Sequence, residues 1–331
     1  MKIIAIEEHL TSPAVVDAWD RLPSWRRDDS VLSLNTGDVA HRLNELGDER
    51  LQLMDASGVD VQVLSLTTPG GQDLDPAEAI ALARDVNDLI AATVKRHPHR
   101  FEGFATLPTP APIAAARELE RSVIDLGLCG AMICGRTGEV NLDDVSMRPV
   151  FEAAASLKVP LYVHPKMPPL SVRQAYYSGF GHDIDLALAA GAPGWHYDAG
   201  IQLLRLVLAG TFDRHPDLQV IVGHWGEVVL FYLERIALLC RFDLNLERPL
   251  LDYFRQNVSY TPSGILSQRY LRWAVEMAGI ERMMFSTDYP FQYAPEGGAR
   301  RFLEESNLSQ ADRTLMASGN WERMRTSRKG K

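Results

Sequence analysis

Cysteine is scarce in this sequence. The three cysteines, Cys129, Cys134 and Cys240, are odd in number and show no paired spacing. A disulfide-stapled secreted domain carries paired cysteines at short intervals, so this pattern indicates reduced thiols. We therefore expect a protein of the cytoplasm rather than an extracellular scaffold.

Long apolar runs are also missing. No window approaches the ~18 uninterrupted apolar residues that a transmembrane helix requires. The start of the chain reaches Glu7-Glu8-His9 after only four consecutive apolar residues, 3–6, which is far too few for the apolar region of a signal peptide. These absences predict a soluble protein without a membrane-spanning segment.

An excess of basic residues is absent. Lysine and arginine total 34 against 43 aspartates and glutamates, which gives a net charge of −9, and the basic residues are scattered. Proteins that bind nucleic acid or anionic membranes carry clustered positive charge. The composition therefore argues against nucleic acid and membrane as partners.

Repeats, low-complexity tracts and linkers are lacking as well. The 331 residues are enough to bury a full core, and 46% apolar with 23% charged residues is ordinary for a globular protein. We therefore expect one domain over residues 1–331.

Eight strand-like segments alternate with amphipathic segments of helical length. The strands are expected at 2–9, 60–66, 101–107, 130–134, 160–164, 219–224, 257–261 and 282–288. The helices are expected at 38–57, 76–97, 113–126, 147–157, 202–212, 228–239 and 267–278. This alternation predicts an α/β protein with a (β/α)₈ (TIM) barrel. A doubly wound open sheet is the alternative, but the first strand lacks the Gly-x-Gly-x-x-Gly that follows it in nucleotide-binding folds.

Two insertions interrupt the alternation. Residues 10–36 separate the first strand from its helix, and residues 165–200 separate the fifth strand from its helix; both are rich in aromatic side chains. Each follows the C-terminal end of a strand, the face on which barrel enzymes place their sites. We expect these loop insertions to shape a pocket or an oligomer contact.

Five acidic or imidazole side chains stand at expected strand ends. They are Glu7 and His9 in the first strand, His164 in the fifth, His224 in the sixth and Asp288 in the eighth. Residues i and i+2 of a strand share a face, so Glu7 and His9 can converge while Glu8 points away. The C-terminal strand ends of a barrel surround one axis, so all five can meet in one cavity. Imidazole favours zinc and carboxylate also suits manganese, so the set predicts a divalent metal site.

Each of these residues alone also has a structural interpretation. Asp288 before an aromatic–proline pair is typical of a turn, and His164 before a proline is typical of a turn or core histidine. The Gly-His-Trp-Gly around His224 is typical of a tight loop. A non-catalytic barrel would need all five positions to be structural, and chance does not readily place all five at strand ends.

Four motifs together resemble the amidohydrolase superfamily. They are Glu7-x-His9, His164-Pro165, Gly223-His224-Trp225-Gly226-Glu227 and Ser286-Thr287-Asp288-Tyr289-Pro290-Phe291. Within the superfamily they resemble the metal-dependent non-oxidative aromatic acid decarboxylases of the γ-resorcylate and 2,3-dihydroxybenzoate type. The likeness extends from the first strand to about Trp321. It implies a (β/α)₈ barrel with one divalent ion, Zn²⁺ or Mn²⁺, held by Glu7, His9, His164 and Asp288.

The resemblance also implies roles around the metal. His224 and Glu227 would act beside the ligands, and Arg235 would help to bind substrate, within the chain or across a subunit interface. A homodimer or homotetramer is expected on the same ground. Many hydrolases of the superfamily begin with His-x-His, and binuclear members carry a bridging Lys at the end of the fourth strand. Here the chain has Glu7-x-His9 and Cys134-Gly135-Arg136, so one metal ion is expected.

The activity that the resemblance implies is decarboxylation of an ortho-hydroxy aromatic carboxylate, a small hydroxybenzoate-type substrate. The ring carbon is protonated first and CO₂ leaves afterwards. Asp288 is the expected proton donor, with His224 hydrogen-bonded to it and Glu227 orienting His224. Phe291 is expected to stack on the ring. The alternative is a metal-dependent hydrolase of a lactone or amide, in which Asp288 acts as base.

The long second insertion leaves three residues open. His182, Trp195 and His196 all fall within 165–200, where a pocket loop is expected. The sequence does not say which of them contacts substrate, nor which ring substituents the pocket accepts.

Overall fold

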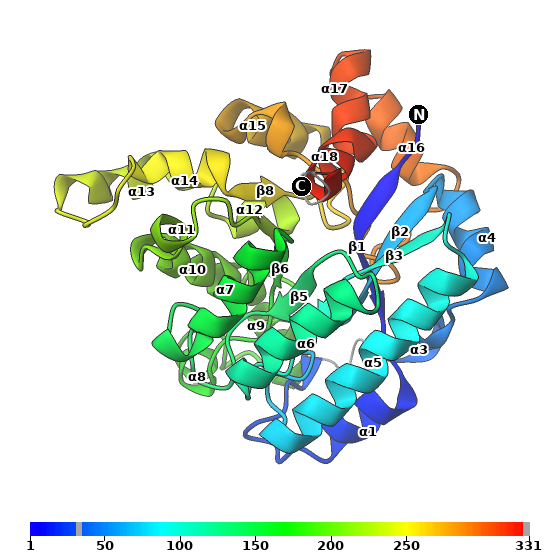
Figure 1. Ribbon diagram of the computed structural model, residues 1–331, viewed down its shortest axis with the longest axis horizontal. Coiled ribbons are helices and arrows are strands. Elements are labelled where there is room, and N and C mark those ends of the chain that lie inside the picture. Colours follow the sequence, from blue (N-terminus) through cyan, green and yellow to red (C-terminus); the bar gives the residue numbers. More distant parts are fainter. Residues whose placement is uncertain (31–34, 327–331) are drawn as a thin grey trace.

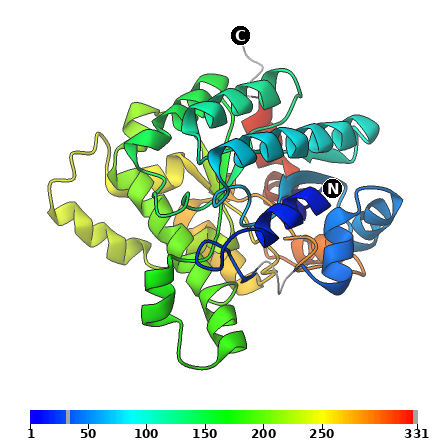
Figure 2. The ribbon, with the colours of Figure 1, turned by 90° about the horizontal axis from the view of Figure 1, so that it is seen from below.

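Parallel strands line the centre of the fold and helices surround them (Figures 1 and 2). The computed structural model describes residues 1–30 and 35–326. The strands are β1 (Ile4–Leu10), β2 (Val61–Leu66), β3 (Phe101–Gly103), β4 (Ala105–Thr106), β5 (Ala131–Cys134), β6 (Leu161–His164), β7 (Val220–Val222) and β8 (Val258–Tyr260). They pair in parallel as two sheets, β1-β2-β3 and β4-β5-β6-β7-β8.

The expected third strand, 101–107, joins the two sheets. It is divided at Phe104, whose backbone N donates to Leu64 O of β2 at 2.8 Å. The next residue, Ala105, turns to the other side and donates to Gly130 O at 2.9 Å. One segment therefore pairs with both sheets, and the ring of strands continues across this junction.

The expected eighth strand, 282–288, closes the ring through isolated bridges. Met283 pairs with Tyr260 of β8, and Phe285 pairs with Ala5 of β1. Between them, Met284 N donates to Tyr260 O at 2.9 Å. First and last strands are thus joined through this segment, which an open sheet would not allow. The (β/α)₈ prediction is confirmed.

Both faces of the strands are buried, which explains their continuous apolar runs. In β2, Val61 and Val63 belong to the cluster that fills the barrel, whereas Leu64 and Leu66 pack outward against the helices. Side chains from several other strands complete the interior, among them Ile4, Ile6, Phe104, Met132, Tyr162, Ile221 and Met284. The barrel is therefore a packed core below its site, not a pore.

The helices follow the strands in order. They are α1 (Pro13–Asp20), α3 (Gly37–Asn44), α4 (Asp48–Ser57), α5 (Pro76–Arg96), α6 (Pro112–Ile124), α7 (Arg148–Leu157), α8 (Leu170–Tyr176), α9 (His182–Ala189), α10 (Gly194–Leu208), α11 (Thr211–Arg214), α12 (His224–Glu227), α13 (Leu233–Ile236), α14 (Leu250–Gln256), α15 (Gln268–Ala278), α16 (Gly298–Glu304), α17 (Gln310–Thr314) and α18 (Asn320–Thr326). Short 3₁₀ or π turns are η1 (Val145–Met147), η2 (Ala237–Arg241), η3 (Ile280–Arg282) and η4 (Leu315–Gly319). No described helix is both long and apolar enough to cross a bilayer.

The helix expected at 38–57 is two helices. The carboxylate of Glu45 accepts hydrogen bonds from Gly47 N at 2.9 Å and from Arg50 N at 2.7 Å. These bonds satisfy backbone donors at the start of α4, so the chain can break after α3 and restart. The apolar periodicity that suggested one helix persists through the break because both helices face the same core.

The prediction of one helix over residues 228–239 is wrong. Val228 has a left-handed φ of 60°, so regular helix cannot continue through it, and only the short α13 and η2 follow. This part of the chain projects as an arm at the left of Figure 1. Leu230 and Leu233 are buried in the core, so part of the apolar pattern does mark a packed face. Phe231, Tyr232 and Phe242 are exposed.

The two insertions lie at the C-terminal ends of the strands, as expected, but they are largely helical. The first contains α1, and its residues 31–34 lie outside the described part of the chain. The second contains α8, α9 and the start of α10. Helices α1, α8 and α9 lie at the same end of the barrel, at the bottom of Figure 1 and toward the viewer in Figure 2.

Candidate metal centre and substrate pocket

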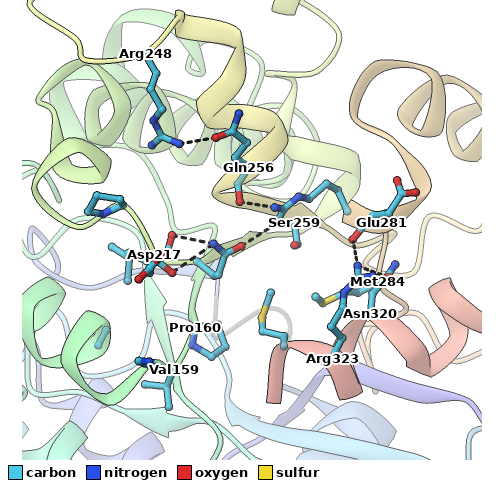
Figure 3. A pocket seen from close by; sticks show the side chains of 17 residues that line it. Val159, Pro160, Asp217, Arg248, Gln256, Ser259, Glu281, Met284, Asn320 and Arg323 are labelled. Atoms are coloured by element: carbon cyan, nitrogen blue, oxygen red, sulfur yellow. Dashed lines mark hydrogen bonds between the residues drawn. The ribbon is translucent and has the colours of Figure 1, made fainter. Parts of the chain in front are cut away.

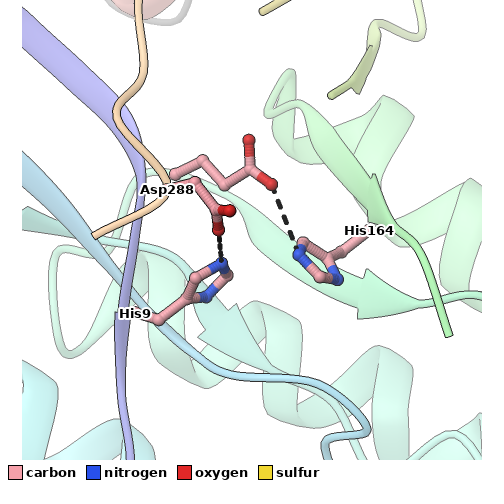
Figure 4. Close-up of side chains that lie close together, drawn as sticks. His9, His164 and Asp288 are labelled. Atoms are coloured by element: carbon pink, nitrogen blue, oxygen red, sulfur yellow. Dashed lines mark ion pairs between the residues drawn. The ribbon is translucent and has the colours of Figure 1, made fainter. Parts of the chain in front are cut away.

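Four of the predicted ligands meet at the C-terminal end of the barrel. Glu7, His9, His164 and Asp288 each offer one atom, and these atoms all lie within 4.8 Å of one another. His9 Nε2 is 3.2 Å from Asp288 Oδ1, and His164 Nε2 is 3.3 Å from a Glu7 oxygen (Figure 4). Strands separated by nearly the whole chain thus bring two imidazoles and two carboxylates to one point.

The free atoms of this group suit a cation. Among the described residues, His9 Nε2 and Glu7 Oε1 have no hydrogen-bond partner although both side chains are fully buried. His164 Nδ1 is 2.8 Å from Pro165 O, a carbonyl that can only accept, so Nδ1 carries the proton and the Nε2 lone pair faces Glu7. Lone pairs and carboxylate oxygens aimed at one point are the ligands that zinc and manganese take.

A buried hydroxyl cluster orients Glu7. Its Oε2 accepts hydrogen bonds from the hydroxyls of Tyr162 and Ser263, and Thr261 Oγ1 lies 3.4 Å away. Gly223 makes room for this cluster, because a Cβ there would lie 2.4 Å from Ser263 Oγ. With Oε2 held in this way, Oε1 is left facing His164 Nε2 and the other ligand atoms.

Glu8 points away from the metal group, as expected for its place in the strand, but it is fully buried. Its carboxylate accepts from Thr287 N at 2.7 Å, from Thr287 Oγ1 at 2.6 Å and from Gln62 Nε2 at 3.0 Å. Burial raises the pKa of Glu8 to about 8. The bonds to Thr287 fix β1 to the residue next to Asp288, and so fix two ligands relative to each other.

His224 and Glu227 lie on a strained turn beside the metal group. The backbone from His224 to Val228 has a positive φ at every residue, between 48° and 93°. Gly226 alone adopts this conformation freely; the other four must be held there by their surroundings. The turn brings His224 Nδ1 to 2.7 Å from Glu227 Oε1 and places the His224 ring centroid 6.2 Å from that of His164.

His196 completes this group and was not predicted. Its Nδ1 is 2.8 Å from the other oxygen of Glu227, and its ring centroid is 4.5 Å from that of His224. His196 stands on α10 in the long insertion, without a motif around it, so nothing local in the sequence could assign it. Only the packing of α10 against α12 brings it to Glu227.

Burial and neighbouring charges shift the protonation of these groups. Burial, and then the Glu7 carboxylate, raise the pKa of Asp288 well above its ordinary value. Burial also lowers the pKa of His9 well below its ordinary value. Burial alone would raise the pKa of Glu227, but the His224 and His196 imidazoles lower it to about 2. Glu227 is therefore a carboxylate across the physiological pH range.

A cavity of about 590 Å³ opens onto the metal group. It is lined by Ser30, Thr68, His164, Asp183, Leu186, Ala187, Ala190, Gly191, Ala192, Trp195, His224, Asp288, Phe291 and Gln292. The ring of Phe291 lies 5.7 Å from that of His9, and the ring of Trp195 lies 6.5 Å from that of His164, between centroids. Two aromatic side chains of the cavity wall thus lie next to the histidines of the metal group.

The expected contact between His224 and Asp288 is not found among the described residues, and Arg235 does not reach the cavity of its own chain. Arg235 is exposed on α13 and does not line this cavity within the described chain. No hydrogen bond joins His224 to Asp288 in the described residues. His224 Nδ1 instead donates its hydrogen bond to Glu227, and the His224 ring faces His164. His182 starts α9, where it is exposed, and it is not among the described residues that line the cavity.

A second cavity, of about 650 Å³, lies at the opposite end of the barrel (Figure 3). Residues that precede strands line it, such as Pro160 before β6 and Gln219 before β7. None of the predicted site residues is among the described residues of its wall. The four predicted metal ligands therefore lie at the C-terminal end of the barrel, away from this second cavity.

The amidohydrolase family model matches residues 9–324. The chain belongs to the amidohydrolase family. This match takes in three of the four motifs on which the resemblance was based, those at His164, His224 and Asp288, and it begins at His9 of the fourth. The predicted family membership is confirmed.

This amidohydrolase is similar to several decarboxylases over its whole length. It is 33% identical to γ-resorcylate decarboxylase of Rhizobium radiobacter over 97% of each chain. The structure of 5-carboxyvanillate decarboxylase from Sphingomonas paucimobilis is 32% identical, covers 98% of this chain and 99% of that one, and superposes with a TM-score of 0.89. A dihydroxybenzoic acid decarboxylase from Polaromonas sp. JS666, solved with bound manganese and the inhibitor 2-nitroresorcinol, is 31% identical over 98% and 97% of the chains, with a TM-score of 0.85.

Proposed function

We propose that this amidohydrolase is a metal-dependent carboxy-lyase that removes CO₂ non-oxidatively from hydroxybenzoate-type aromatic acids. The observation that carries this function is the four-ligand group of Glu7, His9, His164 and Asp288 at the bottom of an aromatic-flanked cavity. Full-length similarity to γ-resorcylate decarboxylase supports the same chemistry.

One divalent ion per chain, Zn²⁺ or Mn²⁺, is the proposed cofactor. Glu7, His9, His164 and Asp288 would hold it, and the unpartnered Glu7 Oε1 and His9 Nε2 support this assignment. A similar decarboxylase binds manganese. When bound, the ion would supply a Lewis acid to the oxygens of the substrate.

The chain's own residues then place a proton on the ring. Asp288 stands on the cavity wall with part of its carboxyl exposed, within reach of a ring that lies against Phe291. It is the proposed donor to the carbon that bears the carboxylate; CO₂ then leaves with its bonding electrons returning to the ring. His224 lines the same wall, and its proton on Nδ1 is fixed by Glu227, so Nε2 is the atom it offers to the substrate.

Arg235 is proposed to act in a second copy of the chain. It lies on the projecting arm, where Phe231, Tyr232 and Phe242 expose apolar rings that a homodimer or homotetramer would cover. From there Arg235 would balance the phenolate or carboxylate of the substrate in the neighbouring site. Residues 1–331 are proposed to act as one domain, because ligands from β1 and from the segment after β8 belong to one group.

The test is product analysis with the purified, metal-loaded protein. Incubation with 2,6-dihydroxybenzoate should release CO₂ and one equivalent of resorcinol. Lactones and amides presented in parallel should not be opened. Acid release from a lactone without CO₂ from any hydroxybenzoate would instead identify a hydrolase on the same barrel.

A further inference from the structure

The cavity at the N-terminal end of the barrel carries more positive than negative side chains. Its described wall holds four cations and two carboxylates: Lys158, Arg248, Arg282, Arg323, Asp217 and Glu281. Arg248 and Arg282 are half-buried, whereas the other four are exposed. The charges that are least accessible to solvent are therefore both positive, in a chain whose net charge is −9.

Arg282 is held in this wall by uncharged acceptors. It donates from Nε to Arg255 O at 2.6 Å, from Nη1 to Gln219 Oε1 at 2.8 Å, and from Nη2 to Gln256 O. None of these acceptors is a carboxylate, so the bonds orient the guanidinium without neutralising it. A guanidinium has five N–H donors, which leaves two of them for a further acceptor.

The other two arginines of the wall are oriented in the same way. Arg248 donates to Gln256 Oε1 and to Asn257 Oδ1, each at 2.8 Å. Arg323 Nη2 donates to Asn320 Oδ1 at 2.9 Å and to a backbone carbonyl at 3.1 Å. Arg248 and Arg323 stand on opposite sides of the group of lining residues (Figure 3). The wall therefore presents fixed guanidinium groups at separate points.

The charges of Arg282 and Arg323 oppose each other. Burial lowers the pKa of Arg282 below its ordinary value. Of the charged residues in the wall, Arg323 lowers this pKa further, and Glu281 raises it by a smaller amount. The repulsion between the two cations thus exceeds the attraction of the nearby carboxylate, and an anion in the cavity would relieve it.

Ser259 adds a buried donor at the bottom of the cavity. It is 1% exposed, and its Oγ has no hydrogen-bond partner in the described part of the chain. Its neighbours in β8, Val258 and Tyr260, pack outward against the helices, so Ser259 faces the barrel interior, where Met284 also lines the cavity. Buried hydroxyls are normally paired, so this O–H is a donor for an oxygen that enters from the cavity.

We propose that this cavity is a second binding site, which takes a small organic anion with two or more oxyanion groups, carboxylates or phosphates. Guanidinium groups bind oxyanions through paired N–H donors, and separate arginines suit separate groups on one molecule. Ser259 would donate to one of these groups. The volume of about 650 Å³ is in the range of small-molecule pockets. The site lies at the end of the barrel opposite the metal group, so it does not depend on the proposed decarboxylation.

The experiment is isothermal titration calorimetry of the metal-loaded, full-length chain at low ionic strength. Fructose 1,6-bisphosphate and tricarballylate are the probes, and fructose and acetate are the controls with no charge and one charge. We expect a Kd below about 1 mM for at least one probe, and none in this range for the controls. Added salt should weaken the binding. Binding of the bisphosphate alone would identify phosphates as the ligand, and binding of tricarballylate alone would identify carboxylates. Two probes weaker than about 1 mM overturn the proposal.

Variants of the wall locate the bound anion. Arg282→Gln should weaken the Kd at least about tenfold, because it removes a charged donor. Arg300→Gln is the matched control: Arg300 is half-buried and also donates to a backbone carbonyl, at 2.9 Å, but it is not among the described lining residues. Ser259→Ala removes only a hydroxyl and should weaken the Kd about fivefold, which keeps the test open if Arg282→Gln does not fold. An unchanged Kd in folded Arg282→Gln, or in Ser259→Ala, overturns the proposal.

A substitution that strengthens binding gives the opposite sign. Glu281→Gln removes an exposed carboxylate from the wall and should tighten the Kd about two- to threefold. The same change at Glu120, which is exposed on α6 and not among the described lining residues, should leave the Kd as it is. Equal effects of the two changes would contradict the site. A probe that binds wild type and Arg282→Gln equally, and is lost on chelation, has bound the metal centre, which also overturns the proposal.

Discussion

His196 and His224 bind opposite oxygens of the same buried carboxylate. His224 Nδ1 lies 2.7 Å from Glu227 Oε1, and His196 Nδ1 lies 2.8 Å from Glu227 Oε2. The second nitrogen of His196 faces Gly191 O at 3.3 Å, so both of its nitrogens face acceptors. Burial opposes charge on His196, but Glu227 outweighs it and raises the pKa of His196. His196 therefore neutralises Glu227 from the side away from the substrate.

We predict that His196→Ala lowers kcat by about 10- to 100-fold with little change in KM. Removing a donor to a buried carboxylate costs about 1.5–3 kcal/mol, and the loss falls on the orientation of His224 rather than on substrate contacts. His196→Gln, which can still donate to Glu227, should recover part of kcat. Steady-state kinetics provide the measurement, with the exposed His182→Ala as control. A loss confined to KM would show that His196 contacts substrate instead.

Asp288→Asn should lower kcat by at least about 10³-fold, because the amide holds no transferable acidic proton. CO₂ release from 2,6-dihydroxybenzoate and elemental analysis should be measured on the same preparation. The two readouts separate the roles: a loss of activity with metal retained supports the donor, and a loss of both supports the ligand. Full CO₂ release at normal metal content would eliminate Asp288 as the donor.

Chelation should abolish turnover and lower Tm, and Mn²⁺ or Zn²⁺ should restore both. A ligand that binds only the folded state stabilises it by about 2.7 kcal/mol at a hundred times its Kd. Differential scanning fluorimetry and elemental analysis supply the measurements, with one metal ion per chain expected. A stoichiometry of two would show that the His196, His224 and Glu227 group, whose ligand atoms also lie within 4.8 Å of one another, holds an ion of its own.

Thr287→Val should lower the free energy of unfolding by about 1–3 kcal/mol, because it removes the hydroxyl bond to the buried Glu8 carboxyl. It should also reduce kcat, since the adjacent Asp288 loses its anchor to β1. Thr93→Val is the matched control: Thr93 Oγ1 bonds only to Leu89 O of its own helix, so its loss should matter little. Denaturant unfolding of both variants is the measurement, and equal losses would contradict the anchoring role.

Stability should fall as pH rises from about 4 to about 6 through Asp198. Burial raises the pKa of this carboxyl from 3.8 to about 6, against the pull of Arg136. Between these values the folded state binds more protons than the unfolded state, so the free energy of unfolding decreases with pH, by up to about 3 kcal/mol. Asp198→Asn should remove this slope in urea unfolding at a series of pH values. Parallel wild-type and variant curves would contradict it.

Local patterns in the sequence sufficed to predict the barrel and to select the four side chains that meet at its C-terminal end. Strands buried on both faces need long apolar runs, and the i, i+2 geometry of a strand puts Glu7 and His9 on one face whatever surrounds them. His164 and Asp288 were predictable for the same reason, because each ends a strand and a barrel gathers strand ends around one axis. The site-residue roles remain predictions, although the structure places these four side chains together.

Features that the sequence did not predict depend on contacts between segments far apart in the chain. His196 reaches Glu227 because α10 packs against α12, and no pattern around residue 196 announces it. The segment after Val228 is not the expected helix because Val228 has a left-handed φ of 60°, which apolar periodicity does not register. Strand and helix periods are properties of neighbouring residues, whereas the partner of a side chain depends on how whole elements pack.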